Sequence, residues 1–196
     1  MPVQSCDVCR PHSGAGHYNR QDLLEISGSL MVTGFVFSRR GGNLLGFLAC
    51  IGMLAFGYYL QFAKGLEPCP LCILQRIALL GAGIAFLVAA IHHPAGRVGA
   101  GIYAGVIALI AAAGAAVATR HVWLQHTPEN QRPACGPSLD YLFSTFGPFE
   151  SLRRILRGSG ECGVVDWTFL SFSIPEWTLA AFIGFIAWAL FLARRN

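Results

Sequence analysis

Charged residues are scarce in this sequence. They make up 12% of the 196 residues, against 54% hydrophobic residues, and the mean hydropathy is +0.53. Soluble domains carry about 25% charged residues, so this chain has too few charges to cover a globule in water. The net charge is only +4 and the arginines are scattered, which excludes the basic groove of a nucleic-acid-binding protein. The composition therefore indicates an integral membrane protein.

A removable signal peptide is also absent from the sequence, because the stretch from Met1 to Leu30 is polar. We expect the first apolar run to serve as an uncleaved membrane signal. Residues 1–40 are interpreted as a flexible, cytoplasmic leader. Cys6 and Cys9 lie in it with two histidines nearby, but their spacing is too short for a zinc finger, and we interpret them as incidental.

Four long apolar runs follow the leader. Each is close to the ~20 residues that cross a bilayer core as a helix, and each carries almost no charge, as burial in lipid requires. Glycines recur inside them, and small residues let membrane helices approach closely. The predicted fold class is an all-α integral membrane protein, a four-transmembrane-helix bundle within residues 41–196. The predicted spans cover residues 43–62, 73–91, 98–119 and 177–193.

An even number of spans places both termini on one side of the membrane. The loops at residues 63–71 and 120–176 then share the other side. Arginines at residues 39–40, 97 and 194–195 mark the terminal side as cytoplasmic. The long loop also carries arginines, so charge decides the orientation only in part. Cysteines in both loops decide it, because thiol pairs that are meant to oxidise belong outside the reducing cytosol.

An amphipathic stretch lies inside the long loop. Its apolar residues fall near one helical face and its arginines lie largely opposite. This pattern predicts a short helix in the membrane interface, although a loop segment packed on the helix ends is the alternative. The apolar residues are Phe146, Phe149, Leu152, Ile155 and Leu156.

The pair Cys69-Pro-Leu-Cys72 opens the second apolar run. Proline is well tolerated in a first helical turn, so we expect Cys72 in or next to that turn, where the helix dipole favours a thiolate. Arg76 lies one turn deeper on the same face, and a guanidinium at a membrane rim needs a partner. That partner could be a thiolate, the oxygen of an electron acceptor or a lipid phosphate. The pattern favours a reactive pair over a static staple of the loop.

Cys135 and Cys162 lie far apart in the long loop. Their spacing fits a structural disulfide that closes the loop, and it fits a second redox couple equally well. Cys50, alone inside the first run, is interpreted as a packing residue. Two reactive pairs on one membrane face would pass electrons by thiol–disulfide exchange. Haem, dinucleotide and iron–sulfur motifs are absent from the sequence, so a lipid-soluble quinone is the natural acceptor.

Ordered motifs from about Asn43 to the C-terminus resemble the bacterial disulfide bond formation protein B (DsbB) family. The resemblance implies a quinone-dependent oxidase of a periplasmic, thioredoxin-fold, DsbA-like protein, using ubiquinone or menaquinone. It further implies the inner membrane, with cytoplasmic termini and periplasmic redox loops. The leader departs from the family. The matching motifs are Pro68-Cys-Pro-Leu-Cys-Ile-Leu-Gln-Arg76, His121-Val-Trp-Leu-Gln125, Cys135-Gly-Pro137, Ser159-Gly-Glu-Cys162, Trp167-Thr-Phe-Leu170 and Ile174-Pro-Glu-Trp177.

The resemblance also implies a role for each site residue. Cys135 takes the mixed disulfide with the partner, and Cys162 exchanges with Cys69. Cys72 is the thiolate that meets the quinone, and Arg76 resembles the quinone-site arginine.

His121 resembles a histidine linked to the quinone region, although a polar interfacial residue is an open alternative. No metal is expected at the Cys-x-x-Cys pair, because Arg76 would repel a cation. Two alternatives to the oxidase remain: a quinone-coupled reductase of the vitamin K epoxide reductase type, and a non-enzymatic membrane scaffold stapled by disulfides.

Overall fold

Four long helices form a bundle in the computed structural model, which describes residues 38–195 apart from 95, 135, 137–138 and 166. By length and composition all four could cross a membrane, so the predicted four-helix membrane fold is confirmed. Each helix covers the predicted run and extends beyond it at both ends. They are α2 (Arg39–Lys64), α3 (Pro70–His92), α4 (Arg97–His126) and α6 (Ile174–Arg194).

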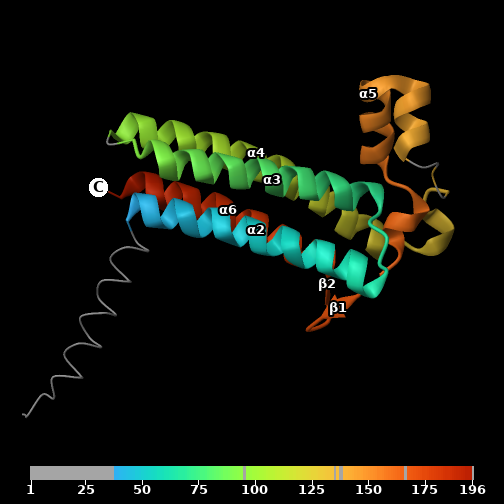
Figure 1. Ribbon diagram of the computed structural model, residues 1–196. Coiled ribbons are helices and arrows are strands. Elements are labelled where there is room, and N and C mark those ends of the chain that lie inside the picture. The colour runs from blue at the N-terminus through green and yellow to red at the C-terminus, as the bar shows by residue number, and fades with distance from the viewer. Residues whose placement is uncertain (1–37, 95, 135, 137–138, 166, 196) are drawn as a thin grey trace, which may run out of the picture. The chain divides into compact units, whose positions relative to one another are not determined.

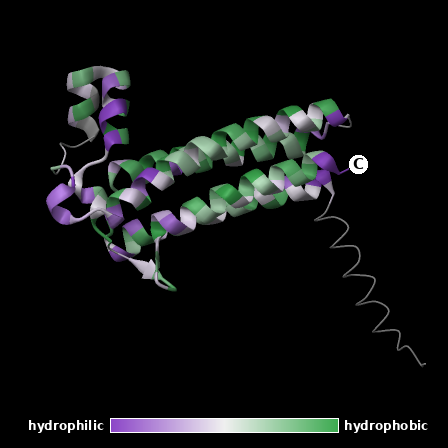
Figure 2. Ribbon diagram, turned by 180° about the vertical axis from the view of Figure 1, so that it is seen from behind, coloured by the Kyte–Doolittle hydropathy of each residue, from purple (hydrophilic) through white to green (hydrophobic). Residues whose placement is uncertain are grey.

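The helices pack so that the start of α2 and the end of α6 lie together at one end of the bundle. α4 packs along α3 and α6, and α2 packs along α3 (Figure 1). At one end, the start of α2 lies against the end of α6, where Arg39 Nε donates to the carbonyl oxygen of Arg195 over 2.9 Å. The opposite end carries the α2–α3 loop and the long α4–α6 connection. Hydrophobic residues dominate the length of the helices, whereas hydrophilic residues gather towards both ends (Figure 2).

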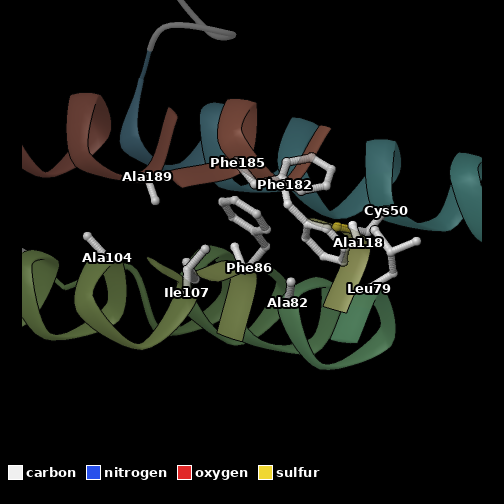
Figure 3. Close-up of a cluster of buried hydrophobic side chains, with 11 residues drawn as sticks. Cys50, Leu79, Ala82, Phe86, Ala104, Ile107, Ala118, Phe182, Phe185 and Ala189 are labelled. Atoms are coloured by element: carbon white, nitrogen blue, oxygen red, sulfur yellow. The ribbon is translucent and has the colours of Figure 1, made fainter. Parts of the chain in front are cut away.

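Small residues on α4 create the space that aromatic rings fill in the core. The buried face of α4 is mostly alanine and glycine, and Phe86 and Phe182 are fully buried beside it. Figure 3 shows their rings gathered with that of Phe185 between the helices. A Cβ atom at Gly114 would lie 2.3 Å from Cζ of Phe182, so glycine is required there for the close approach.

The long connection between α4 and α6 is mostly folded. It contains η1 (Glu129–Gln131), α5 (Leu139–Arg157), η2 (Gly160–Gly163) and a two-residue antiparallel pair, β1 (Thr168–Phe169) with β2 (Phe172–Ser173). α6 then begins with a capping box, in which Glu176 accepts from the backbone N–H of Ser173 over 2.6 Å. Such a cap satisfies the free N–H groups of a helix start.

α5 differs from the single amphipathic helix that the sequence predicts. Gly147, with φ of 73°, and Pro148 break it into two helical parts, which lie side by side in Figure 1. Ile155 is buried with Leu142 against the end of the bundle, whereas Phe149 is 83% exposed. The predicted apolar face is therefore split between packing on helix ends and exposure. A short helix lying in the membrane interface is not confirmed.

Candidate redox site

Cys69 is one of a group of neighbouring thiols at the end of the bundle opposite the start of α2 and the end of α6. It is the N-cap of α3, with extended backbone, and Pro70 occupies the first helical position. Its Sγ atom lies within 4.8 Å of that of Cys72, in the first turn of α3. Its side chain also packs against the buried cluster that contains Cys162 and is close enough to perturb the pKa of that thiol. All three carry free thiols in the structure. Cys69 thus neighbours both other thiols, as an exchange relay requires.

Cys162 reaches this group from η2, far along the chain. It is fully buried in a cluster with Leu71, Leu124 and Ile155, against which Cys69 also packs. The Oγ atom of Ser159 lies 3.7 Å from its sulfur. The pKa of the Cys162 thiol is raised, because its hydrogen bond with the Cys69 side chain and its burial both favour the neutral form.

The turn that precedes η2 depends on a glycine. Gly158 has φ of 81°, and a Cβ atom there would lie 2.2 Å from Cδ1 of Leu124. A larger residue would therefore clash with α4 and strain the backbone at once. The same turn is tied to α4 by Arg120, which donates to the carbonyl oxygen of Arg157 over 2.8 Å. These contacts fix the approach of η2 to the bundle and hence the position of Cys162.

His121 lies beside Cys69 and is held there by Gln75. It continues the buried face of α4, and Gln75 continues the buried face of α3; each side chain is 3% exposed. The Nε2 atom of His121 is 3.7 Å from Sγ of Cys69, and its Nδ1 atom is 3.1 Å from Nε2 of Gln75. The burial of His121 argues against a polar residue facing head groups. Its ring contacts a thiol instead.

Arg76 follows Gln75 in the chain but faces α2. Successive residues of a helix point about 100° apart, so Gln75 can face α4 while Arg76 faces α2. Its guanidinium donates to Oε1 of Gln61 over 2.5 Å and to the carbonyl oxygen of Gly57 over 3.0 Å. It also lies 4.9 Å from the ring centre of Tyr58. The partner that a rim guanidinium needs is thus supplied by α2.

Cys135, Cys6 and Cys9 lie outside the described residues. Two residues that flank position 135 can be placed, and both lie on the turn that precedes Cys162. The carbonyl oxygen of Ala134 accepts from the N–H of Gly160 over 3.2 Å. A Cβ atom at Gly136 would lie 3.2 Å from Cβ of Ser159. The roles of the four predicted cysteines, Arg76 and His121 remain proposals and are argued below.

Sequence reasoning missed Gln75 and Gln61, the residues that orient His121 and Arg76. A signal for Gln75 exists, because it is a polar residue within the buried, otherwise apolar face of α3. Buried amides are retained where they have a hydrogen-bonding partner. Gln61 carries no such signal, since it lies near the end of a span, where polar residues are ordinary.

The fold and the site together define a multi-pass membrane thiol–disulfide oxidoreductase: four membrane-capable helices, with three contacting thiols and a buried histidine at one end. A family model described as "Disulfide bond formation protein DsbB" matches residues 39–192. "Disulfide bond formation protein B" of Xanthomonas euvesicatoria is 48% identical over 166 residues, 83% of this chain and 96% of that protein.

Two further relatives carry the same name. The protein of Hahella chejuensis is 52% identical over 150 residues, which are 76% of this chain and 90% of that protein. The protein of Methylococcus capsulatus is 50% identical over 153 residues, which are 78% of this chain and 93% of that protein. The chain belongs to the DsbB family of disulfide oxidoreductases. This membership favours the oxidase over the vitamin K epoxide reductase type and over a non-enzymatic scaffold.

Proposed function

We propose that this enzyme reoxidises a periplasmic, DsbA-like dithiol protein and passes the electrons to a membrane quinone, ubiquinone or menaquinone. The names of its relatives support a role in disulfide bond formation. The proposed location is the bacterial inner membrane, with both termini cytoplasmic and the thiol end of the bundle periplasmic. Thiols that must be oxidised in use belong in that compartment.

The observation that carries the proposal is that Cys69 lies beside Cys72, with their sulfurs within 4.8 Å, and also packs against the buried cluster that contains Cys162. A thiolate of the reduced partner attacks the disulfide of Cys135 and Cys162 and forms a mixed disulfide with Cys135. The released Cys162 thiolate attacks Cys69, which breaks the Cys69–Cys72 disulfide and leaves Cys72 as a thiolate. The contact between Cys69 and Cys162 is the geometry that this attack needs.

The cycle closes in two further exchanges. The second thiol of the partner displaces Cys135, and the Cys135 thiolate then attacks the Cys69–Cys162 disulfide. The partner leaves oxidised, the Cys135–Cys162 disulfide is restored, and Cys69 and Cys72 hold the two electrons as thiols. The net change moves one disulfide from the Cys69–Cys72 pair to the partner.

The residues around Cys72 fit a quinone. When bound, a quinone supplies an acceptor for two electrons and two protons. The two hydrogen bonds of Arg76 to α2 use two of the five N–H groups of a guanidinium, so the side chain retains donors for a carbonyl oxygen. Arg76 is also within electrostatic reach of Cys72. We assign Arg76 to hold the acceptor beside Cys72.

His121 is assigned a proton-transfer role at Cys69. Its Nε2 atom faces the Cys69 sulfur, and oxidation of the pair must remove a proton from that thiol. Gln75 is a positioning residue, because the hydrogen bond at Nδ1 decides which ring nitrogen carries the proton. The amide nitrogen of Gln75 faces Nδ1. When the amide is turned over, its oxygen accepts from Nδ1–H, and Nε2 is then free to take the proton of Cys69.

Quinone absorbance tests this function. The purified chain is mixed with a reduced thioredoxin-fold dithiol protein and ubiquinone or menaquinone, and wild type is compared with Cys72→Ser. Wild type should reduce the quinone and the variant should not. A wild-type protein that reduces neither quinone, with its loop cysteines unchanged by the partner, would support the stapled scaffold instead.

A further inference from the structure

Cys69, Cys72 and the buried His121 together could ligate a metal ion. One ligand atom each from Cys69, Cys72 and His121 lie within 4.8 Å of one another. We propose that the reduced site binds one soft, zinc-like cation through these three residues. Thiolate and imidazole ligands select such metals over magnesium or calcium.

The spacing of the ligand atoms is close to that of a zinc site. Zn–S bonds of about 2.3 Å and Zn–N bonds of about 2.0–2.1 Å at tetrahedral angles place S and N about 3.6 Å apart and two sulfurs about 3.8 Å apart. Sγ of Cys69 and Nε2 of His121 are 3.7 Å apart. The widest pair among the three ligand atoms is within 4.8 Å, so closure on a cation needs a movement of about 1 Å.

The surroundings of His121 suit a ligand. A metal-binding histidine donates its other ring N–H to a fixed acceptor, which orients the ring. The amide nitrogen of Gln75 lies 3.1 Å from Nδ1. Turning the amide over places its oxygen there to accept Nδ1–H, which leaves the Nε2 lone pair facing Cys69. Since both side chains are buried, the ring is held in this orientation before any cation arrives.

The sequence predicts no metal at this pair, because the positive charge of Arg76 would repel a cation. In the structure the guanidinium of Arg76 faces α2. The guanidinium is bonded to Gln61 and Gly57 on α2, whereas His121 approaches from α4. Two thiolates supply two negative charges to the cation, which outweigh the one positive charge of Arg76, although Arg76 lies within electrostatic reach of Cys72. The cation binds as the two thiols release two protons, so its affinity rises with pH.

Cation binding has a consequence for turnover, and this consequence rests on the proposed function. Bound thiolates are not free to form the Cys69–Cys72 disulfide, and the disulfide offers no thiolates to a cation. The metal and oxidation therefore exclude each other. The reduced enzyme would be inhibited reversibly, whereas the oxidised enzyme would not bind the cation.

Cadmium binding tests the site without any quinone. The full chain with Cys6→Ser and Cys9→Ser is reduced and titrated with Cd²⁺, and the ultraviolet thiolate-to-cadmium band is followed. One Cd²⁺ per chain should bind, Zn²⁺ should displace it, and chemical oxidation should abolish the band. Cys72→Ser and His121→Gln should lose it, while the matched control Cys50→Ala, which changes a thiol in the bundle core, should retain it.

Circular dichroism identifies any variant that fails to fold. If His121→Gln unfolds, Gln75→Leu replaces it, with an expected 10- to 100-fold loss of affinity. Absence of a band in the reduced chain overturns the proposal, and so does a band unchanged in folded His121→Gln or Gln75→Leu. Because the assay contains no quinone, a chain that binds Cd²⁺ but reduces no quinone would refute the proposed function and keep the metal site.

Discussion

Replacing Gln75 by leucine should slow oxidation of the Cys69–Cys72 pair. The change removes the partner of His121 Nδ1, 3.1 Å away, in a place where both side chains are 3% exposed. A buried polar group left without its partner costs about 1–3 kcal/mol. If the misplacement of His121 at Cys69 raises the activation free energy of oxidation by this amount, the oxidation rate falls about 5- to 150-fold.

Single-turnover kinetics measure this effect. The chain, reduced at Cys69 and Cys72, is mixed rapidly with quinone, and quinone absorbance is followed across a pH range. Gln75→Glu is the matched control, because its carboxylate can only accept from Nδ1–H and therefore keeps a hydrogen-bonding partner for the ring. It should keep the rate within tenfold of wild type, with a shifted pH profile.

A purely structural role for Gln75 predicts a different pattern. In that case Gln75→Leu lowers the melting temperature but leaves the rate per folded molecule and its pH profile unchanged. A rate equal to that of wild type in folded Gln75→Leu would refute the assignment of Gln75 as a positioning residue, and with it the role of His121 at Cys69.

Three further predictions follow from single contacts. Gly114→Ala should lower the free energy of unfolding by about 1–3 kcal/mol, because the added Cβ atom would lie 2.3 Å from the Phe182 ring. Gly101→Ala on the same helix, where the added Cβ atom meets nothing within 4 Å, should be neutral or stabilising. Equal thermal unfolding of the two variants would contradict the packing. Arg76→Ala removes a charge-assisted donor worth about 1.5–3 kcal/mol, so the KM for quinone should rise about 10- to 150-fold. Thiol alkylation should still detect the Cys135–Cys162 disulfide in this variant. An unchanged KM would contradict the role assigned to Arg76. The pKa of Cys162 is raised by its hydrogen bond with Cys69 and by burial. The alkylation rate of Cys162 in the reduced chain should therefore increase with pH through a midpoint above the ordinary thiol pKa of about 8.5. A lower midpoint would contradict this environment of the thiol.

The helices were predictable because lipid imposes a strong rule. A chain in a bilayer must satisfy its backbone internally, so apolar length alone located all four helices. The extra turns at their ends, such as residues 120–126 of α4, mix polar with apolar residues, so hydropathy does not mark them as part of a span. The hairpin of α5 was missed because an amphipathic pattern fits one helix or two. The dipeptide Gly147-Pro148, which is typical of turns, was the signal in the sequence that distinguishes them.

Part of the site could be predicted because the spacing of its residues along a helix is typical of a thiol redox pair. Cys-x-x-Cys at a helix start located Cys69 and Cys72, and a four-residue step placed Arg76 with them. Cys162 and Cys69 lie far apart in the sequence, so no local pattern could reveal their proximity. The turn of Gln75 towards α4 and of Arg76 towards α2 depends on helix packing, which motif spacing does not encode.

The central claim is that Cys69 relays electrons between Cys162 and Cys72, and disulfide trapping tests it most directly. Cys72→Ala leaves Cys69 as a free thiol, which attacks Cys162 in the Cys135–Cys162 disulfide and releases the Cys135 thiolate. The disulfide of an oxidised partner captures that thiolate as a mixed disulfide, so a Cys69–Cys162 disulfide should accumulate. Peptide mass spectrometry without reduction identifies that bond. Cys69→Ala, the matched variant, should accumulate no Cys72–Cys162 disulfide. A Cys72–Cys162 bond, or no bond from Cys69 to Cys162 in folded Cys72→Ala, would contradict the relay.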